Sequence, residues 1–260
     1  MEPIFSTTIT KIKGSQKFER EDTLVREIKL ELIVNGEKVG AVMATPVDQE
    51  ALAIGYLMSE NIIERFSDVT SLKLLNDGMR VEIEAKVNQK NIKKLNAEGV
   101  VISGCGKSMT ANIDPEAIEA KVIKSDFSIS AALLSKEMGQ FYTECPLYEQ
   151  TGCVHTAKLF TDAHTYFIGE DIAQHNTIDK VVGKAQMAGI DVTNSFLMVS
   201  GRLSSEMVAK AVMHQIPILA SRTASTCLGL MIAEKFGLTL AGFVRGDTMN
   251  VYRHPRRIHV

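Results

Sequence analysis

The sequence predicts an α/β fold, α+β overall, in which a smaller N-terminal part of hairpins and a helix precedes a larger α/β part. Two patterns predict this division. Between residues 196 and 245, short apolar strands alternate with helical segments, as in right-handed crossovers onto a parallel sheet. Before residue 97, alternating strands are joined instead by short polar turns. We therefore expect a small α+β domain over residues 1–97, a linker over 98–110 and an α/β domain over 111–260.

Turn and cap residues define the elements of the N-terminal part. Asn35-Gly36 predicts a tight primed turn between two strands. Thr45-Pro46 is typical of a helix start, with Thr45 as the cap and Pro46 at the first helical position. We therefore expect strands over 25–34 and 39–43, a helix that ends near Glu60, and a second hairpin with strands over 72–75 and 79–87.

The larger part is predicted to alternate between strands and helices. A short helix is expected to begin at Asp114-Pro115, and residues 151–159 predict a loop that enters either a strand or a helix. Gly169 is interpreted as the point that separates a strand from an amphipathic helix. The remaining predicted helices are 130–142, 170–186, 204–214 and 226–236, and the predicted strands are 163–168, 196–199, 218–220 and 238–244.

Three arginines occupy the same topological position. Arg202, Arg222 and Arg245 each follow a predicted strand, and the carboxyl ends of parallel strands meet at one edge of a sheet, where ligands bind. Predicted helices begin at Ser204 and Ser225, and their free N–H groups suit an anion. A surface ion pair would explain any one of these arginines. Together they favour a site for a phosphate or pyrophosphate.

Histidines and carboxylates suggest polar chemistry but no metal site. Asp171, His175 and Asp179 are spaced four residues apart, so a helix would place them on one face. Such a face could orient the imidazole for proton transfer, pair it structurally, or simply be polar. Near His155 the second residue on is Ala157, whereas zinc nucleoside deaminases use a glutamate there. A hydrolytic deaminase is therefore disfavoured.

Cys105 lies between Gly104 and Gly106, after a short β-branched run. Glycines leave the backbone bare, and the cation of Lys107 would favour the reactive thiolate. A second interpretation is a small apolar residue that is buried after a strand. The four cysteines form no C-x-x-C pair, so we expect reduced thiols and no thiolate zinc site.

Charge and hydropathy limit the partners. The formal net charge of −2 predicts no general attraction to nucleic acid or to an anionic membrane. No apolar stretch is long enough to span a bilayer, and the N-terminus lacks an apolar signal core, so we expect a soluble cytoplasmic protein. The basic segment 253–257 is either a solvated tail or an anion contact.

A set of motifs in a fixed order, almost from end to end, resembles the FdhD family of formate dehydrogenase accessory proteins. They are Met43-Ala44-Thr45-Pro46 with Asp48, Gly55-Tyr56-Leu57-Met58-Ser59-Glu60, Thr151-Gly152 with His155-Thr156-Ala157, Gly169-Glu170-Asp171-Ile172, His175-Asn176, Ser200-Gly201-Arg202, Pro217-Ile218-Leu219-Ala220-Ser221-Arg222 and Phe243-Val244-Arg245-Gly246.

The resemblance implies a sulfurtransferase-type sulfur carrier. Such a protein accepts sulfur from a cysteine desulfurase as a persulfide, here on Cys105, and passes it to the molybdenum or tungsten bis(molybdopterin guanine dinucleotide) cofactor of formate dehydrogenase. It also implies a cytidine-deaminase-like three-layer domain without zinc, a homodimer, and a site that a GDP-like nucleotide can occupy. The implied cofactor-binding residues are Arg202, Arg222, His155, His175 and the segment Phe243, Val244, Arg245, Gly246, Asp247 and Thr248.

The loop around Cys105 departs from the family pattern, which is usually Cys-Gly-x-Cys-Gly. Here either Ile102 stands in place of the first thiol or Ser108 stands in place of the second, so a two-cysteine relay within the loop is excluded. Cys153 stands where the family usually has glycine, and one hypothesis is that it supplies the missing thiol. An alternative function is a chaperone that delivers the cofactor without sulfur transfer.

Overall fold

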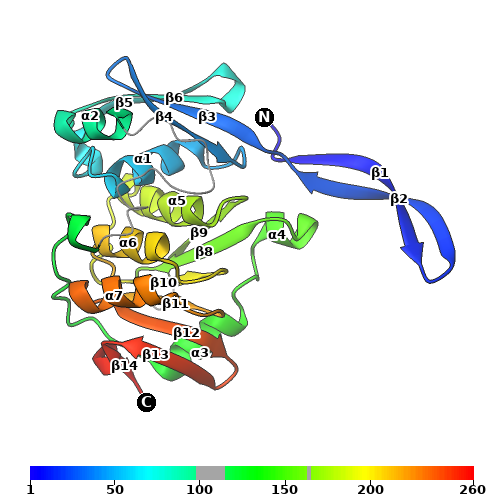
Figure 1. Cartoon of the computed structure of the whole chain (residues 1–260). Coiled ribbons are helices and arrows are strands. Elements are labelled where there is room, and N and C mark those ends of the chain that lie inside the picture. Colours follow the sequence, from blue (N-terminus) through cyan, green and yellow to red (C-terminus); the bar gives the residue numbers. More distant parts are fainter. Residues whose placement is uncertain (98–114, 163–164) are drawn as a thin grey trace.

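The computed structural model describes residues 1–97, 115–162 and 165–260. In these ranges the chain forms a projecting two-stranded arm and a layered body with a four-stranded and a six-stranded sheet (Figure 1). The mixed α/β class and the N-terminal hairpins agree with the prediction. Cys105 and Lys107, with the linker proposed over 98–110, lie outside the described residues.

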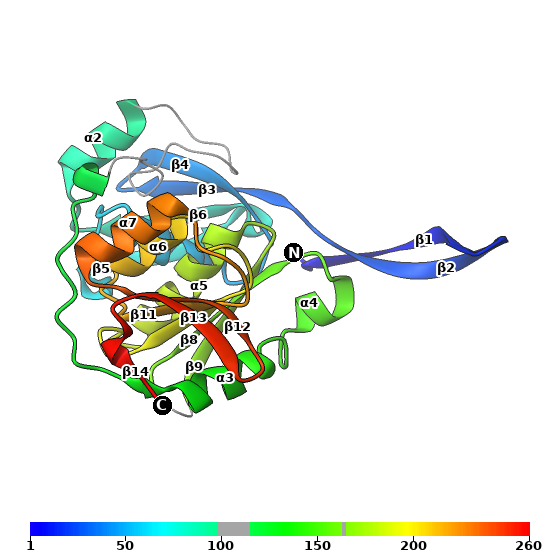
Figure 2. The ribbon, with the colours of Figure 1, turned by 60° about the horizontal axis from the view of Figure 1, so that its bottom comes forward.

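The arm consists of β1 (Ile4–Lys13) and β2 (Gln16–Val25), which pair antiparallel from Ile4↔Val25 to Lys13↔Gln16. It extends away from the body in both views (Figures 1 and 2). The sequence-based strand over 25–34 was therefore too long, because Val25 ends the arm and a separate strand begins at Ile28.

The four-stranded sheet has the order β4-β3-β6-β5, with β3 and β6 parallel. Its strands are β3 (Ile28–Val34), β4 (Glu37–Ala44), β5 (Val69–Leu75) and β6 (Arg80–Ala85), with 3₁₀ turns at Phe66–Asp68 and Asn76–Gly78. Asn35 and Gly36 both have positive φ, at 50° and 79°, as a primed turn requires. Both predicted hairpins are confirmed.

Helices α1 (Gln49–Ser59) and α2 (Gln89–Ala97) complete the N-terminal part. The expectation that Thr45 caps α1 was wrong. The helix begins after Asp48, and Thr45 is fully buried. Its hydroxyl accepts a hydrogen bond from the backbone N–H of Ile172 at 3.2 Å. The oxygen that was expected to cap the helix is therefore bonded to a distant segment of the chain.

The six-stranded sheet has the order β13-β12-β11-β10-β8-β9. Only β10, β11 and β12 are parallel to one another, and the other pairs are antiparallel, so the expected parallel sheet is a mixed one. The strands are β8 (His155–Phe160), β9 (Tyr166–Asp171), β10 (Phe196–Val199), β11 (Ile218–Ser221), β12 (Thr239–Arg245) and β13 (Thr248–Arg253).

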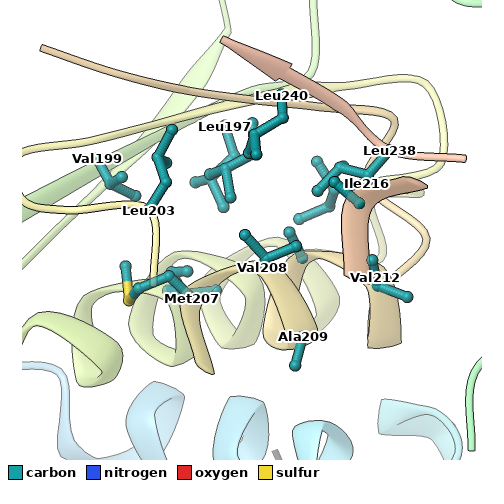
Figure 3. Packing of buried hydrophobic residues seen from close by; sticks show 14 of the residues in the cluster. Leu197, Val199, Leu203, Met207, Val208, Ala209, Val212, Ile216, Leu238 and Leu240 are labelled. Carbon is teal, nitrogen blue, oxygen red and sulfur yellow. The ribbon is translucent and has the colours of Figure 1, made fainter. Parts of the chain in front are cut away.

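Helices cover both faces of this sheet. Helices α5 (Gln174–Met187), α6 (Ser205–Met213) and α7 (Cys227–Phe236) pack on one face. There Val208 of α6 faces Leu197 of β10, and Val212 of α6 lies beside Ile216 (Figure 3). Helix α3 (Ala131–Gly139) packs on the other face. The shorter elements are a 3₁₀ turn at Pro115–Ala117, α4 (Pro146–Thr151), a 3₁₀ turn at Pro255–Arg257, and the paired strands β7 (Ile129–Ser130) and β14 (Ile258–His259).

Helix α5 begins later than expected. Gly169, Glu170 and Asp171 belong to β9, where Asp171 pairs with His155 of β8, and the helix starts only at Gln174. Polar residues inside a strand imitated a helix start. They are tolerated there because the Lys180 ammonium reaches the Asp171 carboxylate at 2.7 Å.

No helix among the described residues is long and apolar enough to cross a membrane.

Candidate anion-binding site

The loops that follow β10 and β11 are joined by hydrogen bonds. The Ser221 hydroxyl donates to the Gly201 carbonyl at 2.7 Å, and the Leu203 N–H donates to the Ala224 carbonyl at 3.0 Å. In return, the Thr226 N–H donates to the Leu203 carbonyl at 3.1 Å. The edge predicted from the strand order is therefore a continuous bonded surface.

The end of β12 joins the same edge. The Phe243 N–H donates to the Thr223 carbonyl at 3.0 Å, and the Arg245 Nε donates to the Arg222 carbonyl at 3.1 Å. Arg222 is further anchored through Nη1, which lies 3.4 Å from the Met138 carbonyl. Arg222 and Arg245 are thus neighbours, as their position in the sequence predicted.

Phe243 has an unusual backbone conformation. Its φ is 50°, which is a genuine outlier for a bulky residue, and it lies at a register shift between β12 and β13. The residue is 39% exposed, and the Arg245 guanidinium lies 5.6 Å from the centroid of its ring. Gly246, Asp247 and Thr248 are exposed beside it, whereas the Val244 side chain is fully buried in the core. Of this segment, Val244 can offer a ligand only its backbone.

A cavity of about 460 Å³ lies beside the first of these loops. It brings together three of the predicted residues, His155 from β8, His175 from α5 and Arg202 from the loop after β10. Its other lining residues are Glu27, Met43, Ile172, Ala173, Gln174, Ser204, Glu206 and Met207. The helix α6 begins at this cavity, and Ser204 makes no side-chain cap, so its first N–H groups are not satisfied by that hydroxyl.

The two histidines have different surroundings. His155 Nδ1 lies 3.1 Å from the Ser200 hydroxyl, and burial lowers the pKa of the ring, with His175 and Arg202 acting in the same direction and Asp171 against them. His155 is therefore neutral at pH 7, since an ordinary histidine already has a pKa of about 6.5. His175 Nδ1 lies 3.8 Å from a Glu206 carboxylate oxygen.

The three arginines have no carboxylate partner among the residues that the structure describes. Within the described ranges, the guanidinium groups of Arg202, Arg222 and Arg245 make no salt bridge to a carboxylate. The Arg202 backbone is held by the Gln174 amide, which donates to its carbonyl at 2.8 Å. This arrangement leaves positive charge available to an anionic ligand.

The predicted acidic face around His175 does not exist. Asp171 ends β9 and is buried, where it accepts hydrogen bonds from the Thr45 N–H at 3.1 Å and the Asn176 amide at 2.9 Å. Asp179 is also buried, and it pairs with Lys210 at 2.8 Å and accepts from the Ser59 hydroxyl at 2.7 Å. Both carboxylates connect layers of the body and do not orient an imidazole. The described residues also hold no group of three or more His, Cys, Asp or Glu side chains suited to a metal ion.

The described thiols differ in exposure. Cys145 is buried, and burial raises the pKa of its thiol to about 11, so it stays protonated and unreactive. Cys153 is exposed in the loop between α4 and β8, and Cys227 is exposed at the start of α7. Neither exposed thiol lines the cavity.

Several cavity residues were not predicted from the sequence. Gln174 and Glu206 lie close in sequence to the predicted residues His175 and Arg202, and this closeness was the available signal. Glu27 comes from the connection between β2 and β3, and Met43 comes from β4. No local pattern marks them, because only the packing of the two sheets brings them to the cavity.

The fold and this edge define a mixed α/β protein with a candidate anion-binding surface built on the ends of parallel strands. The profile of the FdhD/NarQ family matches residues 25–259. The chain therefore belongs to the FdhD/NarQ family, which confirms the resemblance seen in its motifs.

Similar proteins agree with this assignment. A Wolinella succinogenes protein named sulfur carrier protein FdhD is 42% identical over 240 residues, which cover 92% of this chain and 84% of that protein. A protein of the same name from Xanthomonas axonopodis pv. citri is 33% identical over 261 residues, with coverage of 96% and 91%. A crystal structure from Desulfotalea psychrophila, described as a proposed formate dehydrogenase accessory protein, superposes with a TM-score of 0.82 at 26% identity and covers 99% of this chain and 100% of that one.

Proposed function

We propose that this protein is a sulfur carrier accessory to a formate dehydrogenase. In this role it accepts sulfur from a cysteine desulfurase as a persulfide on Cys105. It then transfers the sulfur to the molybdenum or tungsten bis(molybdopterin guanine dinucleotide) cofactor, which is bound as a substrate. The names of the relatives support the sulfur-carrier role, and the family loop motif supports Cys105 as the carrier.

The observation that carries the cofactor part of the proposal is a set of arginines on one bonded edge that, in the part of the chain described by the structure, make no salt bridge to a carboxylate. Arg222 and Arg245 are joined through a 3.1 Å hydrogen bond, and Arg202 lines the adjacent cavity with two histidines. Guanidinium groups and helix N-termini are the protein groups best suited to phosphates. The pyrophosphate of a guanine dinucleotide, or of GDP as its mimic, matches this surface in charge.

The sulfur chemistry needs only one thiol on this chain. The Cys105 thiolate attacks the terminal sulfur of the desulfurase persulfide, a new S–S bond forms on Cys105, and the desulfurase thiolate leaves. In the second step a nucleophile on the cofactor takes the terminal sulfur, and the Cys105 thiolate leaves. Lys107 would favour the thiolate in both steps.

Two finer expectations belong to the same proposal. A homodimer and a cytidine-deaminase-like larger domain without zinc are what the resemblance implies, and both stay predictions. Ala157, two residues after His155, is fully buried on β8, so the glutamate of a zinc deaminase has no counterpart at this position.

A second candidate function is a chaperone that delivers the cofactor without sulfur transfer. The observation in its favour is the single thiol in a loop where the family usually has two. This function would use the arginine edge alone, so a Cys105→Ala variant would support the client enzyme as well as the wild type does.

Intact mass after incubation with a cysteine desulfurase and cysteine distinguishes the two functions. Sulfur transfer predicts a gain of one sulfur atom that a thiol reductant reverses, present in the wild type and absent in Cys105→Ala. The absence of any gain in the wild type, together with retained GDP binding, would favour the chaperone.

A further inference from the structure

Ser200 is held beside His155 by the backbone of the sheet. It is the first residue after β10, which runs antiparallel to β8 with Val199 opposite Ala157. Its N–H donates to the Thr156 carbonyl at 2.9 Å, and its hydroxyl accepts from the Thr156 N–H at 3.1 Å. These two bonds fix the position of the hydroxyl oxygen independently of any ligand.

The same oxygen lies 3.1 Å from His155 Nδ1. One lone pair is already used by the Thr156 N–H, and the hydroxyl still has a proton to donate. Within the described residues, the hydrogen-bond acceptor in contact with this hydroxyl is His155 Nδ1. Donation of the proton requires a bare lone pair on Nδ1, which leaves the ring proton of neutral His155 on Nε2.

We propose that Ser200 is a positioning residue whose hydroxyl holds His155 in the neutral tautomer that carries its proton on Nε2. This inference deepens the proposed function, because His155 lines the cavity with Arg202 and His175. The ring then offers a phosphate oxygen one N–H donor and adds no charge, while Arg202 supplies the positive charge.

The charged and titratable groups around the ring fit this role. Asp171 at the end of β9 favours a protonated ring, whereas His175 on α5 and Arg202 disfavour it, as does burial, which has the largest effect. Glu206 on α6 and Glu27 are the other charged residues that line the cavity. Because burial and the Ser200 hydroxyl favour the same neutral form, ligand binding through His155 should not change between pH 7 and 8.

Long-range ¹H–¹⁵N spectra of protein labelled with ¹⁵N-histidine test the tautomer directly in the free protein. A His155→Gln variant assigns the ring signals. We expect wild-type His155 at pH 7 to be neutral with the proton on Nε2, and Ser200→Ala to show a mixture of tautomers. Ser200→Thr keeps the hydroxyl and should restore the wild-type signals. A loss of one neutral hydrogen bond should weaken GDP binding by about five- to tenfold in Ser200→Ala.

Three outcomes would overturn the inference. They are a wild-type ring with its proton on Nδ1, a charged ring at pH 7, or a Ser200→Ala spectrum identical to that of the wild type. The wild-type measurement decides the question even if Ser200→Ala folds poorly. A wild type that shows the expected tautomer but binds no GDP would count against the proposed function alone.

Discussion

Gly55 of α1 lies in direct backbone contact with Asp179 of α5, because a Cβ atom on Gly55 would stand 2.0 Å from the Asp179 carbonyl oxygen. A reciprocal contact joins Gly183 of α5 to Ala51 of α1, because a Cβ atom on Gly183 would stand 1.9 Å from the Ala51 carbonyl oxygen. The two helices belong to different parts of the sequence, and they approach this closely only because glycine stands at both positions.

Replacement of Gly55 by alanine should therefore force the two helices apart. We expect Gly55→Ala to lower the free energy of unfolding by about 1–3 kcal/mol, as overpacking in a core does. Urea denaturation measures the change. Gly139→Ala is the matched control, since a Cβ there meets no atom within 4 Å and should leave the stability unchanged or slightly raised. Equal effects of the two substitutions would contradict the close approach.

Lys210 should be needed to keep Asp179 buried. Lys210→Met leaves the carboxylate with the Ser59 hydroxyl as its recorded partner, and a broken buried pair costs about 3–5 kcal/mol. The double variant Asp179→Asn with Lys210→Met should recover part of this loss. Lys235→Met removes the exposed pair with Glu116 and should cost less than about 1 kcal/mol. Urea denaturation measures the free energy of unfolding of each variant. If Lys210→Met lowered it as little as Lys235→Met does, Lys210 would not be needed to keep Asp179 buried.

His214 should make stability fall in mild acid. Burial, helped by the nearby Lys210 charge, lowers the pKa of His214 to about 3, while its unfolded value is about 6.5. The folded state therefore binds fewer protons, and its stability is complete above pH 6.5 and declines towards pH 3. Between pH 6.5 and 5 the loss should be about 2 kcal/mol.

His214→Gln retains a partner for the Ser59 hydroxyl, which lies 2.9 Å from His214 Nε2, and should flatten this pH dependence. His259→Gln alters an exposed histidine and should keep the wild-type slope. Thermal unfolding followed across this pH range checks both variants. If the slope persisted in His214→Gln, another group would have to cause it.

Arg245 should bind the phosphates of GDP. Arg245→Gln should weaken GDP binding by about ten- to a hundredfold, because a hydrogen bond to a charged group contributes about 1.5–3 kcal/mol. Isothermal titration calorimetry gives the affinity, and the loss should shrink as salt is raised. Arg256→Gln removes an exposed arginine outside the edge and should bind GDP normally. Equal losses in both variants would point to non-specific charge attraction.

Cys153 is the remaining candidate for a second thiol. It is exposed but does not line the cavity, so we expect Cys153→Ala to take up sulfur and to transfer it as the wild type does. Mass spectrometry measures the uptake, and the activity of the client formate dehydrogenase reports the transfer. Normal uptake with lost transfer would instead show that Cys153 replaces the missing loop thiol.

The sequence predicted those features of the structure that are determined by residues close to one another along the chain or by the order of its strands. Asn35-Gly36 has the dihedral angles that its turn needs, and Arg222 and Arg245 meet because both follow parallel strands. The arm was not predicted, since β1 and β2 expose both faces and so lack a clear apolar alternation.

The two misplaced helix starts share a physical cause, which is burial of polar groups by distant residues. Thr45 and Asp171 have the composition of a helix start, but they bond to each other across 126 positions of sequence. The position of Glu27 in the cavity is equally non-local. Such contacts are decided by how the two sheets pack, and a single sequence carries no periodic signal for them.

The contact between α1 and α5 has a consequence for how the molecule unfolds. Each helix covers a core of its own part, yet the two share a backbone interface without intervening side chains. Separation of the parts would expose that interface and the buried Asp179 to water at the same moment. The N-terminal and C-terminal parts should therefore melt in one cooperative transition, and calorimetry should record a single heat-absorption peak in place of two.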